Sequence, residues 1–238
     1  MSPALPADSR SPRGKTLLRI DNPVATVALI SDHRILIDGL SASLGDDPTL
    51  NIVCAVDSTL SEREQVVDHG PDIVVIDQAI SNGGAFDVAN DLRARLPESK
   101  LVFLAGDASD IVVELALRIR CDGFLSTNER VAGFIDSLKS IADGGQRFSP
   151  DIAERLTYDH IQGEYSLRVD TPLRSLTNRQ LQVLRYLACG DSVKEVARKL
   201  HLSPKSIDNH KYRIMNKVGV RDRVQLARFA IREGLIDA

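Results

Sequence analysis

Short apolar runs alternate with longer amphipathic segments between residues 24 and 148 of the chain. The five apolar runs, each of five or six residues, are 26–30, 51–56, 72–76, 100–105 and 122–126. The amphipathic segments between and after them are 35–44, 62–68, 86–96, 111–119 and 131–142. Regular alternation of strand and helix patterns predicts an α/β domain, a five-stranded parallel sheet with right-handed crossovers and helices on both faces.

Two acidic residues stand at the ends of predicted strands. Residues 73–76 are four apolar residues in a row, which is typical of a strand buried on both faces, and Asp77 follows them directly. Asp32 follows the first predicted strand. Because functional groups collect at the carboxyl ends of parallel strands, we expect both carboxylates at one edge of the sheet. Asp77 is either a structural end to its strand or part of a site, and both interpretations stay open.

The composition, 43% hydrophobic and 26% charged residues, predicts a soluble globular protein. The apolar runs are far shorter than the roughly 18 residues of a membrane span. Residues 1–23 are rich in Ser, Pro and Arg and lack the apolar core of a signal peptide, so we expect a disordered tail and a cytoplasmic protein without a membrane partner. Cys54, Cys121 and Cys189 are widely spaced and predict neither disulfides nor a metal site.

Charge divides the chain into two parts. Residues 173–238 carry 14 Lys and Arg against six Asp and Glu, a net charge of +8, whereas residues 1–172 carry 16 against 27, a net charge of −11. Such a division predicts a module that binds a polyanion, attached to a domain that does not. We place the N-terminal domain at 24–148, a linker with a short helix near 151–157 at 149–172, and the basic domain at 173–238.

The basic segment has the capping signals of four short helices. Thr177 precedes the first, Ser192 with Glu195 forms a capping box at the second, and Ser203 with Pro204 opens the third. Only a short turn separates the second and third helices, which is the spacing of a helix-turn-helix. The segment therefore predicts a small all-α domain.

The third of these helices has two distinct faces. Ile207, Ile214 and Val218 lie on one face at helical spacing. The polar residues on the other face are Lys205, Asp208, Asn209, Tyr212, Arg213 and Asn216. Cations suit phosphates, and amides and hydroxyls suit base edges, so this face predicts entry into the major groove of double-stranded DNA. A helical domain that binds only protein is the alternative.

Residues of about 24 to 156 resemble the receiver domain of bacterial response regulators, a flavodoxin-like fold. The resemblance rests on SDHRILIDGL after the first strand, DIVVIDQAI at the third, AGD at the fourth and GFLSTNE at the fifth. It implies that Asp77 is the phospho-acceptor position. It also implies that Asp32, Asp77 and the carbonyl of Ala79 are the ligands of a weakly held Mg²⁺ ion.

Several positions depart from the receiver pattern. Ser31 replaces the first acid of the usual pair, Ala105 replaces the usual hydroxyl residue, and Thr127 replaces the usual lysine. The flanking loop also differs, with Ser81 in place of Pro and Ala85 in place of Gly. Without the lysine, a phosphoryl group on Asp77 lacks its counter-ion, so we expect the phosphorylation switch to be lost. Phe124 occupies the switch-aromatic position, or is simply a core residue.

Residues from about 173 onward resemble the LuxR-type (NarL/FixJ-type) DNA-binding domain over about 60 residues. LTNRQLQVL, SVKEVARKL, LSPKSIDNH and IMNKVGVRDR occur in the family's order and spacing. The resemblance implies that residues 192–211 form the helix-turn-helix. It implies this set of DNA-binding residues: Ser192, Lys194, Lys205, Ser206, Asp208, Asn209, Tyr212 and Arg213. Gln180 and Val193 depart from the family pattern, which has glutamate and asparagine there.

Together these observations predict a DNA-binding transcriptional regulator that is not an enzyme, requires no cofactor, and is controlled independently of aspartyl phosphorylation. One alternative is an ordinary response regulator, phosphorylated on Asp77 with Mg²⁺ by a sensor kinase. Another is a protein-interaction module with a vestigial DNA-binding domain. We expect a homodimer on DNA. Val224, Ala227 and Ile231 form an apolar stripe on the last helix, which we assign to the core first and to a dimer seam second.

Overall fold

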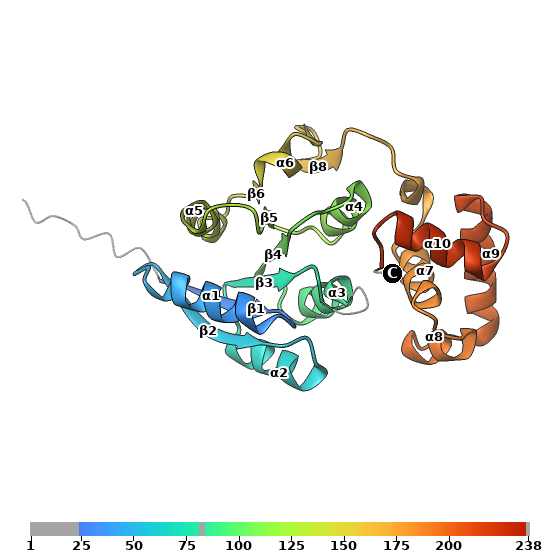
Figure 1. Cartoon of the computed structure of the whole chain (residues 1–238), viewed down its shortest axis with the longest axis horizontal. Helices are drawn as coiled ribbons and strands as arrows, with labels where there is room; N and C mark the ends of the chain where they lie inside the picture. The colour runs from blue at the N-terminus through green and yellow to red at the C-terminus, as the bar shows by residue number, and fades with distance from the viewer. Residues whose placement is uncertain (1–23, 81–83, 237–238) are drawn as a thin grey trace, which may run out of the picture.

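The computed structural model describes residues 24–80 and 84–236. The tail at 1–23 and the loop position Ser81 therefore lie outside the described residues. Its N-terminal domain contains a parallel sheet in the order β2-β1-β3-β4-β5-β6 (Figure 1). The strands are β1 (Ala25–Ile30), β2 (Leu50–Val56), β3 (Ile73–Asp77), β4 (Lys100–Ala105), β5 (Gly123–Ser126) and β6 (Arg147–Phe148).

The strand count differs from the predicted five because β6 adds a sixth strand at the edge. This strand has only two residues, Arg147 and Phe148, which pair with Gly123 and Phe124 of β5. Two residues are too few to produce an alternating pattern, so sequence periodicity does not detect them. The α/β class and the parallel direction of the sheet are confirmed.

Helices cover both faces of this sheet (Figure 1). They are α1 (Arg34–Gly45), α2 (Leu60–His69), α3 (Ala85–Arg95), α4 (Asp110–Arg118) and α5 (Val131–Ala142). Apolar residues of α1 and α5 pack on one face, and those of α2, α3 and α4 pack on the other. All five residues of β3 are buried, as its unbroken apolar sequence predicts. This packing fixes Asp77 at the edge where the carboxyl ends of the strands meet.

The segment after the sheet is more ordered than its sequence suggests. A four-residue helix, α6 (Pro150–Ala153), replaces the longer helix expected at 151–157. An antiparallel hairpin of β7 (Leu156–Asp159) and β8 (Glu164–Leu167) follows it. The hairpin is held by contacts between aromatic rings of β7, β8 and β6, and its turn is closed by Asp159, which accepts two backbone hydrogen bonds. These are tertiary features that a short polar sequence does not reveal.

The C-terminal domain is a bundle of short helices. They are the 3₁₀ helix η2 (Pro172–Ser175), α7 (Asn178–Ala188), α8 (Val193–Lys199), α9 (Pro204–Val218) and α10 (Arg223–Arg232). The predicted caps are confirmed: Thr177 and Ser192 each form a capping box, with Gln180 and Glu195 respectively. The Ser203 hydroxyl accepts a hydrogen bond from the backbone amide of Ser206. Pro204 follows Ser203 as the first residue of α9.

The two domains pack against each other. Helices α7 and α10 face the receiver side of the molecule, and α9 lies on their far side (Figure 1). One continuous apolar cluster includes buried residues of both domains. Among the described residues, no helix combines the length and apolar character that a bilayer crossing requires.

Candidate nucleic-acid interface and acceptor site

Asp77 ends β3 and is buried, with 5% of its surface exposed. Its Oδ2 atom accepts a hydrogen bond of 2.6 Å from the Ser31 hydroxyl, and the Nδ1 atom of His33 lies 2.9 Å from the same oxygen. Its Oδ1 atom accepts from the backbone amide of Ala79 at 2.9 Å. Both carboxylate oxygens therefore have partners within the protein itself, two for Oδ2 and one for Oδ1.

His33 is a site residue that the sequence analysis missed. Its imidazole is largely exposed, but the hydrogen bond to Asp77 raises the pKa of His33 above its ordinary value, and the charge of Asp77 acts in the same direction. The Ser31 hydroxyl also accepts from the backbone amide of His33 at 2.9 Å, so the three side chains form one cluster. A histidine three residues after a strand gives no sequence signal of its own, because only the fold brings it to β3.

At the expected Mg²⁺ site, Asp32 and Asp77 each accept hydrogen bonds from the protein. Asp32 accepts a hydrogen bond from the backbone amide of Ser58 at 3.0 Å and lines a cleft of about 480 Å³ with Asp57 and Glu62. The described residues bring together no group of three or more His, Cys, Asp or Glu side chains that could hold a metal ion. Ala79 contributes its backbone amide to Asp77.

The other altered positions lie at the same edge of the sheet. Ala105 ends β4 and is buried, and the exposed Thr127 donates its backbone amide to the Ala105 carbonyl at 2.8 Å. At these positions the chain offers a methyl group and a hydroxyl rather than a hydroxyl and a cation. Phe124 is 1% exposed and stacks on Phe103 with ring centroids 5.9 Å apart. This position agrees with the interpretation of Phe124 as a core residue.

Helix α9 presents the predicted polar face to solvent. Ile207 and Ile214 are fully buried, and Tyr212 is 68% exposed. The other residues of the predicted DNA-facing set that are exposed are Ser192, Lys194, Lys205, Asp208, Asn209 and Arg213. Ser206 is half-buried against the helix cap, where its hydroxyl lies 2.8 Å from that of Ser203.

Besides Ser206, two members of this set already have partners in the protein. The Ser192 hydroxyl accepts from the backbone amide of Glu195 and caps α8. The carboxylate of Asp208 accepts from Lys211 at 2.6 Å, which reduces the negative charge on the outward face of α9. The face is therefore exposed and polar, as a surface for DNA requires.

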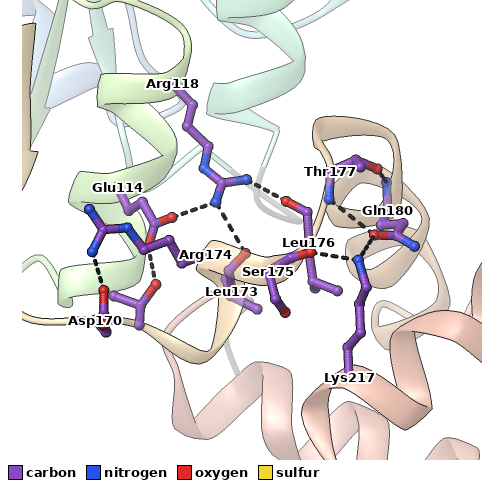
Figure 2. A network of polar contacts seen from close by, with 11 residues as sticks. Glu114, Arg118, Asp170, Leu173, Arg174, Ser175, Leu176, Thr177, Gln180 and Lys217 are labelled. Atoms are coloured by element: carbon purple, nitrogen blue, oxygen red, sulfur yellow. Dashed lines mark hydrogen bonds and ion pairs between the residues drawn. The ribbon is translucent and has the colours of Figure 1, made fainter.

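A polar network joins the receiver-like domain to the helical domain through η2 (Figure 2). Arg118 of α4 donates to the carbonyls of Leu176 and Leu173 at 2.7 and 3.1 Å, and it pairs with Glu114 at 2.5 Å. On the other side of η2, Lys217 of α9 donates to the Ser175 carbonyl at 2.5 Å. The connection between the domains is thus a set of specific contacts with both α4 and α9.

Comparison with known proteins agrees with this architecture. The profile of the bacterial regulatory proteins of the LuxR family matches residues 174–230. The transcriptional regulatory protein UhpA of Escherichia coli is 33% identical over 204 residues, covering 85% of this chain and 96% of that protein. The response regulator UvrY of Escherichia coli is 24% identical over 216 residues, covering 89% and 96%.

A solved structure has the same fold. RcsB from Salmonella enterica serovar Typhimurium, bound to promoter rprA in the presence of phosphomimetic BeF3-, has a TM-score of 0.63 and 18% identity, and the match covers 86% of this chain and 97% of that chain. A receiver fold joined to an exposed helix-turn-helix defines a two-domain response regulator. The chain belongs to the LuxR family of bacterial response regulators and is a DNA-binding protein of transcription regulation.

Proposed function

We propose that this response regulator binds its DNA sites without phosphorylation of Asp77. The observation that carries the proposal is the cluster around Asp77, in which Ser31 and His33 contact Oδ2 and the Ala79 amide donates to Oδ1. A hydrogen bond to a charged group contributes about 1.5–3 kcal/mol, and a phosphoryl group on one carboxylate oxygen competes with the contacts that this oxygen makes.

The altered receiver positions Ala105 and Thr127 also weaken the response of the domain to any phosphoryl group on Asp77. Thr127 supplies no cation to pair with the roughly two negative charges of a phosphoryl group. Ala105 supplies no hydroxyl to donate a hydrogen bond to that group. Allosteric coupling between sites is typically only about 1–3 kcal/mol, which the loss of these partners is large enough to remove. The receiver-like domain then receives its input from a partner, a ligand or the protein concentration.

The DNA-binding step uses the outward face of α9. Asp208, Asn209 and Tyr212 are placed to meet base edges, and Lys205 and Arg213 to meet phosphates. Two modules on neighbouring half-sites, about one helical turn apart, would place two copies of the chain on one operator. We therefore propose a homodimer as the DNA-bound form.

Helix α10 offers a surface for this dimer. Val224 is 68% exposed and Ile231 is 40% exposed, while Ala227 between them is half-buried. The first assignment of this stripe, to the core, is wrong for Val224 and Ile231, because the core face of α10 consists of Leu226, Phe229 and Ala230. The stripe is thus free to meet a second copy.

A single set of measurements tests the proposal. The full-length protein, treated with a small acyl phosphate and Mg²⁺, is expected to keep its intact mass and its DNA footprint. Asp77→Ala is expected to change operator affinity by less than about threefold, which is under roughly 0.7 kcal/mol. Sedimentation with operator DNA is expected to give two chains per operator. A stable phosphoryl adduct that tightens DNA binding tenfold or more would instead identify an ordinary phosphorylated regulator.

A further inference from the structure

An apolar groove lies between α1 and α5, on the side of the receiver-like domain that faces away from the helical domain (Figure 1). Its volume is about 280 Å³, and its walls include Leu36 and Leu40 of α1 and Phe134 of α5. Among the described residues that line it, Glu129 is the one charged side chain. A groove of this kind is suited to a short apolar segment that carries a cation.

The rim of the groove leaves apolar side chains in water. Ile35 of α1 is 87% exposed, and Val131 of α5 is 45% exposed. A Cβ atom added at Gly39, on the α1 wall, would meet no atom within 4 Å, so the groove is open there. Within α1, which the structure describes completely, Leu44 alone is buried. Because apolar surface is favoured out of water, this face of α1 is suited to a segment that covers it.

The chain that precedes β1 is long enough to reach this groove. Its densest apolar run is residues 17–20, which are Leu, Leu, Arg and Ile. The chain enters β1 beside the end of α1, where the Ala25 amide donates to the Thr49 carbonyl at 2.9 Å. From residue 17 to residue 24 an extended chain spans roughly 23 Å. The part of α1 that lines the groove, from Ile35 to Ser43, is about 12 Å long.

Charge favours this segment over a second copy of the chain as the occupant. Residues 1–23 carry four Lys and Arg against two Asp and Glu, a net charge of +2. Residues 24–172 carry 12 against 25, a net charge of −13. The preceding segment is therefore attracted to the domain, whereas two such domains repel each other. Arg19 lies within the apolar run, and Glu129 lines the groove.

We propose that residues 17–20 dock in the groove between α1 and α5 and cover it. Alternate residues of an extended segment point the same way, so Leu18 and Ile20 face the walls together, and Arg19 lies at the rim near Glu129. This run is then an exception to the disordered tail expected at 1–23. The docked segment excludes other proteins from this face until it is released. The proposal goes beyond the proposed function and does not depend on it.

Methyl nuclear magnetic resonance of the full-length protein with a soluble paramagnetic agent tests this docking. Ile161, which is 97% exposed at the turn of the hairpin, is the reference for an open side chain. We expect Ile35 to broaden at least about threefold less than Ile161, because the docked run removes it from water. Leu18→Asp combined with Ile20→Asp should raise the broadening of Ile35 to that of Ile161. Equal broadening of Ile35 and Ile161 in the unaltered protein would overturn the proposal.

Two glycines of α1 provide a matched pair of groove variants. A Cβ atom would meet nothing within 4 Å at either Gly39 or Gly45, but only Gly39 lines the groove. Gly39→Lys should move the Ile20 methyl resonance to its random-coil position, and Gly45→Lys should leave it unchanged. Protection of Ile35 that survives Leu18→Asp with Ile20→Asp would also overturn the proposal. If that protection rises with protein concentration, together with dimers in sedimentation, the occupant is a second copy.

Discussion

The contact between His33 and Asp77 can be tested through the titration of His33. Since the hydrogen bond and the charge of Asp77 raise the pKa of His33, nuclear magnetic resonance should give a midpoint above the ordinary value of about 6.5. Asp77→Asn should return it toward that value. His210, whose pKa is lowered by burial and by nearby arginines, is an internal control that should not move. A His33 midpoint unaffected by Asp77→Asn would contradict the cluster.

The sign of the linkage follows from the direction of this shift. A histidine with a raised folded-state pKa contributes its full stabilisation below the unfolded-state value near 6.5 and loses it as the pH rises through the folded-state value. The contribution to the free energy of unfolding is small, because His33 is more than half exposed and solvent screens the pair. The effect therefore concerns the local geometry of the acceptor position more than global stability.

Gln180 is a second residue whose chemistry can be altered without changing its shape. Its Oε1 accepts from the Thr177 amide and from Lys217 Nζ, both at 3.0 Å, and the residue is 4% exposed. In Gln180→Glu, a carboxylate would accept both bonds near a cation and the amino end of α7. We expect a gain of about 1 kcal/mol in the free energy of unfolding, measured by denaturant titration. In a Lys217→Met background most of this gain should vanish, and a gain that persists would rule out the pair as its source.

At the scale of elements, helix α9 carries two kinds of residue: some are placed to read base edges, and others are placed to contact phosphates. Asn209→Ala and Tyr212→Ala should relax preference at one or two base pairs, each by about 1–3 kcal/mol, because amide and hydroxyl groups read base edges. Lys205→Ala should weaken binding to all sequences alike and reduce the salt dependence, because it removes a phosphate contact. Anisotropy titrations on operator and scrambled duplexes distinguish the two patterns, and equal losses for all three variants would argue against base readout by α9.

Local elements could be predicted from the sequence because local interactions determine them. The caps at Thr177, Ser192 and Ser203 are formed by residues within three positions of each other, and the buried strand before Asp77 has an unbroken apolar run. The β7–β8 hairpin was missed because its stability comes from contacts with the ring of Phe148 and from packing against α4.

The acceptor cluster shows the same limit. The topology of the sheet predicts that Asp32 and Asp77 lie at one edge, yet the contact between His33 and Asp77 joins residues 44 positions apart. The hydrogen bond from the Ser58 amide to Asp32 likewise joins residues 26 positions apart. Sequence patterns thus predict which edge holds a site, whereas hydrogen-bond partners depend on side-chain placement.

At the scale of the whole molecule, the two domains have opposite charge, and their packing places the acidic one away from the DNA-facing helix. The N-terminal 172 residues carry −11 and the rest carry +8, and α9 lies beyond α7 and α10 as seen from the receiver (Figure 1). An acidic domain held on the far side repels DNA less than one that is free to approach it, because screening removes interactions beyond about 10 Å at 0.1 M salt. We therefore expect the packing of the domains to favour DNA binding.

Asp87 of α3 joins the two domains through polar contacts with α7. It pairs with the buried Arg185, and its carboxylate also accepts from the Tyr186 hydroxyl. Burial, the charge of Asp87 and its hydrogen bond raise the pKa of Tyr186 to about 12. Asp87→Asn would leave the Arg185 cation buried without its counter-ion, at a cost of about 3–5 kcal/mol while the domains stay together. Separation of the domains relieves that cost by returning Arg185 to water, so we expect separation rather than unfolding.

Small-angle scattering of full-length Asp87→Asn should show a larger radius of gyration, with helix content unchanged by circular dichroism. Asp91→Asn, one turn further along α3 and paired with Arg95 on the surface, is the matched control and should scatter like the original protein. The tether between the domains should also become more sensitive to limited proteolysis in Asp87→Asn, because η2 would no longer be held against both α4 and α9. An unchanged radius of gyration, together with a folded protein and a resistant tether, would mean that the apolar contacts between the domains hold them together without this ion pair.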